Sequence, residues 1–181
     1  MRIHRWVVLV MVAALTSCQS HPGDQPPLTP AQKTGVESSV RSFLSTVGHD
    51  VTQEGPAAWS KFFLDSPSFF MASEGRLQFA DAQEARAAIQ GLTRIIRHID
   101  LRCGDDLRVD VLTPYLAVVG ASYSEVRSDA EGHQVNETGY FTGVTQFENG
   151  RWQIPRRALV GRGSSRESPV KLCFISICRR S

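Results

Sequence analysis

The sequence offers little that would identify a reaction. Its 181 residues include four cysteines and five histidines, and no spacing of His, Cys and carboxylate residues fits a metal site. No glycine-rich loop of the kind that cradles phosphate is present, and neither is a serine nucleophile elbow. We therefore expect neither a metal nor another cofactor.

The net charge is also small. The formal net charge of +2 is too small to indicate a nucleic-acid partner, and the composition is that of an ordinary globular chain long enough for one domain. The small positive excess is unevenly placed, because eight basic residues fall in the last part of the sequence. They are Arg151, Arg156, Arg157, Arg162, Arg166, Lys171, Arg179 and Arg180.

The N-terminus, "MRIHRWVVLVMVAALTSC", has no hydrophobic run long enough to span a bilayer. Arg2 and Arg5 precede an apolar run of about ten residues, which is half of the length that a membrane-spanning helix needs. Small residues then lead to Cys18. This order predicts a signal peptide over residues 1–18.

The end of this segment, "LTSC", resembles a bacterial lipobox. The resemblance implies that Cys18 is acylated and becomes the mature N-terminus, which would hold the protein on a membrane surface. The alternative is a plain signal peptide cut elsewhere. Gln19, in place of Asp, favours the outer membrane by similarity to enterobacterial sorting. Residues 19–30 are proline-rich and polar, so we expect a tether and a lipid-anchored envelope protein facing the periplasm.

The domain proper, residues 31–154, begins with helical patterns. A helix is predicted from Thr29–Pro30 through residue 50, and a second, shorter one over 52–63. A short pair of strands is predicted within 68–81, and a third helix over 81–98, with Asp81 as its cap.

After residue 98 the hydrophobic period becomes two. Strands are predicted over 99–113, 115–128 and 134–148, and Asn149–Gly150 is a hairpin signal before a last strand from Arg151. Helices followed by antiparallel strands indicate an α+β fold. A strongly bent sheet over the three helices would leave a conical cavity.

Three segments carry a resemblance to a known family: "EARAAIQGL", "LAVVGASYSEV" and "GYFTGVTQFENGRWQI". They resemble the nuclear transport factor 2-like superfamily, in particular its SnoaL-like, calcium/calmodulin-kinase-association-like branch, over about residues 32–154. The resemblance implies a cone-shaped α+β barrel with three N-terminal helices on a curved antiparallel sheet. It also implies a homodimer formed through the open sheet face.

The superfamily includes ketosteroid isomerase, polyketide cyclases, dehydratases and members with no known reaction. Tyr123 and Glu125 share one strand face, and we expect Tyr140 on the next strand, across from Ala121. A tyrosine and a carboxylic acid in a dry cavity would resemble the isomerase, where such groups donate hydrogen bonds to an oxyanion. The alternative is that they are solvent-side residues, and the isomerase's Asp base has no clear counterpart here.

Two functions follow from this reading. The first is a domain that binds a small apolar molecule in its cone, or forms dimers, without turnover. Trp59, Phe63 and Phe70 are then candidate ligand contacts, or else plain core. The alternative is an isomerase, cyclase or dehydratase that uses acid–base groups in the cone.

The sequence departs from the family pattern after Ile154. Related domains continue as "GRWQIRxAHWSV", whereas this chain reads "GRWQIPRRALVG". With suitable codons, deleting one nucleotide after Ile154 restores Ala-His-Trp-Ser. We hypothesise that residues 155–181 are an anomalous tail read out of frame; a lineage-specific tail and a cloning artefact are the alternatives. Pro155 lacks a donor, so we expect the neighbouring strand to lose its partner unless residues 171–178 replace it.

Overall fold

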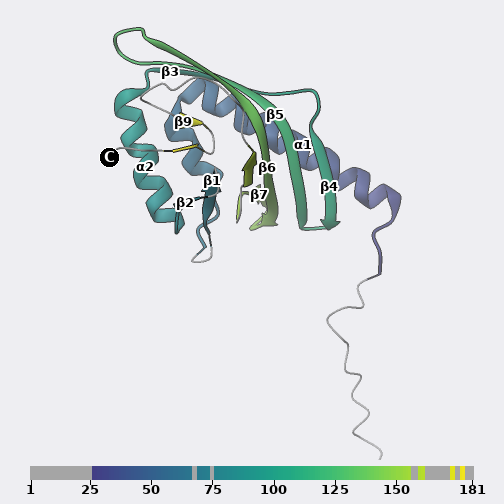
Figure 1. Ribbon diagram of the computed structural model, residues 1–181. Coiled ribbons are helices and arrows are strands. Elements are labelled where there is room, and N and C mark those ends of the chain that lie inside the picture. Colours follow the sequence, from purple (N-terminus) through teal and green to yellow (C-terminus); the bar gives the residue numbers. More distant parts are fainter. Residues whose placement is uncertain are drawn as a thin grey trace, which may run out of the picture.

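The structure is a computed structural model that describes residues 26–66, 69–73 and 76–155, together with short strands at 159–161, 172–173 and 176–177. A strongly curved antiparallel sheet wraps over the helices, as Figure 1 shows. The predicted α+β cone is therefore confirmed, with the helices on the concave side of the sheet. Residues 1–25, and with them Cys18, lie outside the described residues.

The first helix, α1 (Pro30–Glu54), is longer than its sequence pattern predicts. It starts in a capping box, in which the Thr29 N–H donates to Gln32 Oε1 at 2.9 Å and the Gln32 N–H donates to Thr29 Oγ1 at 3.3 Å. It ends at Gly55, whose φ of 80° favours glycine, and Pro56 follows. Its buried side chains recur every three or four residues: Val40, Leu44, Val47 and Val51.

The predicted second helix is correct only in part. The first residues of the predicted range, 52–63, belong to α1, and the rest forms a short 3₁₀-helix, η1 (Pro56–Lys61). Gly55 separates the two because its backbone is not helical. Trp59 on η1 is buried, and η1 packs against the helix that follows it in the chain.

A short hairpin leads into that helix. Strands β1 (Met71–Ser73) and β2 (Arg76–Phe79) pair antiparallel, as predicted. Helix α2 (Ala82–Ile95) is capped by Asp81, whose Oδ1 accepts from the Glu84 N–H at 2.8 Å. The helix ends earlier than expected, because the chain is already extended in the next strand three residues later.

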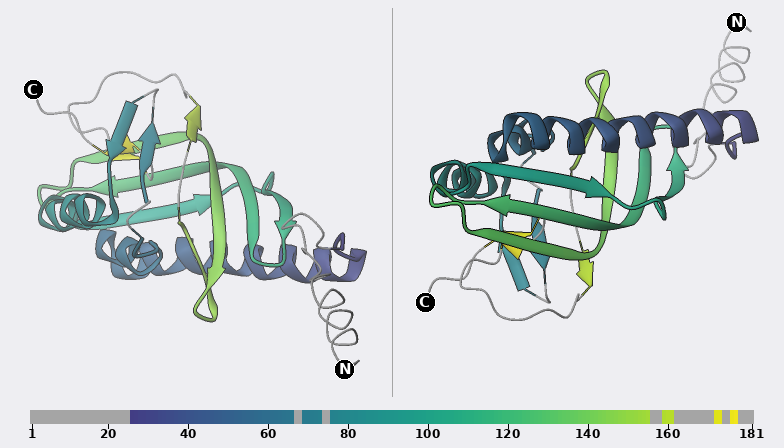
Figure 2. Two further views of the ribbon diagram at one scale, coloured as in Figure 1. Left: turned by 90° about the horizontal axis from the view of Figure 1, so that it is seen from below. Right: turned by 90° about the horizontal axis from the view of Figure 1, so that it is seen from above.

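The main sheet is built on one long hairpin, β5 (Leu116–Ser128) with β6 (Gln134–Glu148). The strands beside it are β3 (His98–Cys103), β4 (Arg108–Thr113), β7 (Arg151–Gln153) and β8 (Leu159–Gly161). Strands β3 and β4 both pair with β5, and β7 and β8 both pair with β6. Figure 2 shows α1 lying along the edge that β3 and β4 form.

A bulge separates β3 from β4. From the Cys103–Tyr123 pair to the Arg108–Gly120 pair, this edge advances by five residues while β5 advances by three. Asp106 fills the gap, because its Oδ1 accepts from the N–H of Ser122 at 2.9 Å and from its hydroxyl at 2.8 Å. These bonds lower the pKa of Asp106. Such an excess bends a sheet, which suits the curvature seen here.

The closing strand is interrupted after β7. The turn before it has two positive φ angles, 52° at Asn149 and 79° at Gly150, as a tight hairpin requires. After β7 the chain leaves β6: the Ile154 N–H donates to the Phe62 carbonyl at 2.8 Å, and the Leu64 N–H donates to the Ile154 carbonyl at 3.1 Å. The strand stops here because its backbone groups change partner.

The chain then returns to the same edge. Strand β8 pairs with residues 140–142 of β6, so the expectation that this strand loses its partner is wrong there. The expected replacement, residues 171–178, is not that partner. Its described parts, β9 (Leu172–Cys173) and β10 (Ser176–Ile177), pair with each other.

Candidate functional site

A group of polar side chains lies on the concave side of the β5–β6 hairpin. Along both strands the odd-numbered residues face the helices, and we call this side the inner face and the opposite side the outer face. Four of these odd-numbered residues form what we call the inner polar cluster: Tyr123, Glu125 and Arg127 on β5, and Glu137 on β6. Their surroundings on the inner face are apolar, with Ile99, Leu101, Ala121 and Phe141 all buried.

Arg127 joins the two carboxylates of the cluster. Its Nη1 donates to Glu125 Oε1 at 2.8 Å, and its Nη2 donates to Glu137 Oε2 at 3.1 Å. Glu125 and Arg127 are 2% and 3% exposed, whereas the side chain of Glu137 keeps 22% of its surface. The cluster is therefore buried at one end and reaches solvent at the other.

The charges in the cluster depend on one another. Glu125 and Glu137 stand directly opposite across the two strands, where like charges destabilise a sheet. An arginine stays protonated in proteins, and a buried charge is costly unless it is paired. Arg127 thus compensates the two facing carboxylates, and it needs them as partners because it is buried itself.

Tyr123 is buried beside these charges, and its ring lies over Gly139 on the next strand. A Cβ atom at Gly139 would lie 2.7 Å from the Tyr123 hydroxyl oxygen and under 3 Å from two ring atoms. Only glycine leaves room for the ring in this position. Gly139, which pairs with Tyr123 across the two strands, therefore allows the position that the Tyr123 hydroxyl takes.

The sequence placed Tyr123 and Glu125 together, and the structure does the same. Both are buried on the inner face, so the alternative that they are solvent-side residues is wrong. Tyr140 was expected across from Ala121, and this is also wrong, because it pairs with Ser122 and points to the outer face with 43% of its surface exposed. A shift of one residue moves a side chain to the other face of a sheet.

The aromatic candidates occupy two environments. Trp59 and Phe63 are buried in the main core, and the Phe63 ring lies 5.2 Å from that of Phe69. Phe70 is half-buried. Their contact with a ligand stays a prediction.

Sequence reasoning missed Arg127 and Glu137. The signal was present, because residues 123, 125 and 127 alternate on one strand and must share a face. Charged residues near a hairpin are ordinarily expected in solvent. The pairing that buries them depends on the curvature of the sheet, which the pattern does not reveal.

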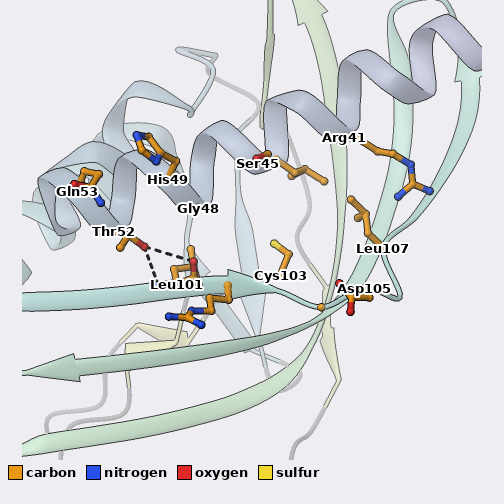
Figure 3. A pocket seen from close by; sticks show the side chains of 13 residues that line it. Arg41, Ser45, Gly48, His49, Thr52, Gln53, Leu101, Cys103, Asp105 and Leu107 are labelled. Carbon is orange, nitrogen blue, oxygen red and sulfur yellow. Dashed lines mark hydrogen bonds between the residues drawn. The ribbon is translucent and has the colours of Figure 1, made fainter.

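A groove of about 650 Å³ lies elsewhere, between α1 and β3 (Figure 3). Inside it, Thr52 closes the free edge of β3: its Oγ1 accepts from the Leu101 N–H at 3.0 Å and donates to the Leu101 carbonyl at 3.5 Å. The arginines at its rim already have partners, because Arg41 is 2.8 Å from Glu37 and Arg102 is 2.7 Å from Asp100.

A second hollow of about 510 Å³ adjoins the first at residues 102–104. It lies partly on the outer face, where Ser122, Ser124 and Thr138 line it. Neither hollow includes Glu125, the carboxylate among the predicted site residues, whereas Tyr123 lines the second hollow.

The turn between β5 and β6 brings Asp129, Glu131 and His133 together. Asp129 holds the turn, because its Oδ1 accepts from the N–H groups of Glu131 and His133 at 3.0 and 2.9 Å. His133 Nδ1 lies 2.9 Å from Asp129 Oδ2, which lowers the pKa of the aspartate and raises that of the histidine. These hydrogen bonds explain why the three side chains lie together, because they stabilise the turn.

No protein-family model and no curated protein matches the sequence. Solved structures do. A scytalone dehydratase-like protein from Novosphingobium aromaticivorans is 8% identical, with a TM-score of 0.67 over 79% of this chain and 94% of that one. A nuclear transport factor 2-like protein from Salmonella enterica is 12% identical, with a TM-score of 0.61 over 77% and 99%.

A third neighbour is hexachlorocyclohexane dehydrochlorinase LinA-type3 from Novosphingobium barchaimii. It is 10% identical, with a TM-score of 0.56 over 74% of this chain and 90% of that one. At these identities the likeness is one of fold. The chain has the nuclear transport factor 2-like fold that its sequence resembles.

Proposed function

We propose that the domain binds a small, mainly apolar molecule on the inner face, with the polar end of that molecule at the inner polar cluster. The buried ion pair of Glu125 and Arg127 is the observation that carries this proposal. An ion pair in such a place is often no more stabilising than apolar residues of the same size, so stability alone does not explain it. An apolar site with a few convergent polar groups is typical of ligand binding.

Two tyrosine variants test the proposal. A fluorescent apolar probe, anilinonaphthalene sulfonate, is titrated into the protein, and small apolar alcohols are then added as competitors. We expect Tyr123→Phe to weaken competition by alcohols, since it removes a buried hydroxyl, and Tyr140→Phe, on the outer face, to leave it unchanged. Equal effects of both variants, or no competition at all, would refute the proposal.

A second candidate function is an elimination reaction. The names dehydratase and dehydrochlorinase of two neighbours denote reactions that remove a proton from the substrate. The Glu137 carboxylate is held by Arg127 and partly open to solvent, which suits a general base. Chloride release from hexachlorocyclohexane is the direct assay, with Glu137→Gln as its control. Binding without any release would leave the first proposal standing alone.

We also propose that two copies pair through the outer face. Along the middle of this face the side chains are small and uncharged, and Tyr140 stands exposed among them. The residues that share this description are Val118, Ser122, Ser124, Thr138, Thr142 and Val144. Mass measurement in solution tests the idea: we expect a dimer, and Tyr140→Arg should yield monomers. A wild-type protein that stays monomeric at high concentration would exclude it.

The location in the cell envelope is likewise our proposal, based on Cys18 and the segment before it. Among the residues that the structure describes, no helix is long and apolar enough to cross a membrane. Partition between detergent and aqueous phases tests the anchor. Wild-type protein should enter the detergent phase, and Cys18→Ser, which cannot be acylated at this position, should remain in water. Equal partition of both would rule out lipidation.

A further inference from the structure

The two carboxylates of the inner polar cluster differ in their access to a ligand. Glu125 is 2% exposed, and its Oε1 is held by Arg127 in the interior. The Glu137 side chain keeps 22% of its surface, and among the described residues its hydrogen-bond partner is Arg127, at Oε2. A carboxylate offers about four lone-pair positions, so Glu137 keeps acceptor capacity on the side that solvent reaches.

Arg127 decides which hydrogen-bonding role this end of the cluster plays. Its guanidinium stays charged, and its two terminal nitrogens already donate to Glu125 and Glu137. The carboxylate oxygens that Arg127 contacts act as acceptors, and a carboxylate has no hydrogen-bond donor to offer. The cluster therefore presents an acceptor to a ligand, where the isomerase resemblance implies a protonated acid that donates.

We propose that Glu137 sets the specificity of the site and that it selects a ligand whose polar group is a hydrogen-bond donor. An ammonium, an amide N–H or a hydroxyl group fits, whereas a carboxylate or phosphate meets like charge and finds no donor at Glu137. This inference rests on the proposed binding function and deepens it. The ligand class is then an apolar amine, amide or alcohol.

Three probes with the same apolar chain and different head groups test this selection: hexylamine, hexan-1-ol and hexanoate. The full chain is titrated with each by calorimetry at about neutral pH, where hexylamine is a cation and hexanoate an anion. We expect hexylamine to bind tightest and hexanoate weakest, with about 10- to 100-fold between them. If hexanoate binds as well as hexylamine, the selection is wrong while the binding function survives. If none of the three binds, both fail.

Variants then assign the selection to one residue. Glu137→Gln should remove the preference for hexylamine, Glu137→Asp should keep it, and Glu148→Gln, an exposed residue of the same strand, should change nothing. Circular dichroism checks that each variant folds. A Glu137→Gln protein that weakens all three probes equally would show a structural role and overturn the proposal. If that variant does not fold, the order of the three probes on the wild-type chain still decides it.

Discussion

Replacing Arg127 by methionine should be among the most destabilising single changes on the inner face. Arg127 is 3% exposed, and its guanidinium lies 2.8 Å from Glu125 and 3.1 Å from Glu137. Methionine keeps most of the volume, so the change removes charge more than packing. The two carboxylates then face each other across the strands without the cation that compensates them, at a cost of about 3–5 kcal/mol in the free energy of unfolding.

Chemical denaturation measures this loss, and thermal unfolding should show it as a fall in Tm of about 10 °C for a domain of this size.

Two results would refute this reasoning. One is a loss below about 1 kcal/mol, which is the size of an exposed ion pair. The other is a failure of the matched double variant to recover any stability, because the charge of the facing carboxylates would then have no part in the loss. The double variant Arg127→Met with Glu125→Gln is the matched control, and it should recover part of the stability because it carries one charge fewer.

Three further predictions rest on single observations. Gly139→Ala should lower the free energy of unfolding by about 1–3 kcal/mol, measured by urea denaturation, because the added Cβ displaces the Tyr123 ring. In the control Gly143→Ala, the Cβ would meet its nearest neighbour at 3.8 Å, so the loss should be far smaller. Equal losses in the two variants would contradict this packing. Asp106→Asn should lower the free energy of unfolding at neutral pH. Because the folded pKa of Asp106 is lowered, the difference in that free energy between wild type and variant should shrink as the pH falls below the ordinary value of 3.8. A difference that does not depend on pH would contradict this. The genomic DNA over codons 150–162 should yield Ala-His-Trp-Ser after one deletion; any other codons would remove the frameshift hypothesis.

The fold follows from the sequence where one local signal is decisive. The cap at Thr29, the cap at Asp81 and the Asn149–Gly150 turn each fix one end of an element, and the structure has all three. Alternation marks the long strands for the same reason, since each buries one face. The 3₁₀ form of η1 and the end of α2 were not predicted, because they depend on how neighbouring elements pack.

Two of the four residues of the inner polar cluster were predicted from the sequence. Tyr123 and Glu125 were placed together because residues two apart on a strand share a face. Arg127 and Glu137 were not predicted, because the residues that flank a charged side chain in the sequence do not indicate whether a curved sheet will cover it. Burial of charge is set by pairing across strands, which here joins Glu125 with Glu137.

The two breaks beside the long hairpin explain which expectations survived. Between β3 and β4, and again between β7 and β8, the edge of the sheet contains two residues more than the strand it pairs with. At the second break, six residues separate Gln153 from Leu159, whereas four separate their partners Gln146 and Thr142. At the β3–β4 break the excess of two is even, so the side chains at the start of β4 stay in phase with those of β3. The sequence alternation therefore still identifies the inner face, although it shows neither bulge. The expected partner of Tyr140 differed from the true one by a single residue. A register error of an odd number of residues places the side chain on the opposite face of the sheet. Predictions of faces in this fold therefore tolerate the break between β3 and β4, whereas an error of one residue in the register of the β5–β6 hairpin makes them fail.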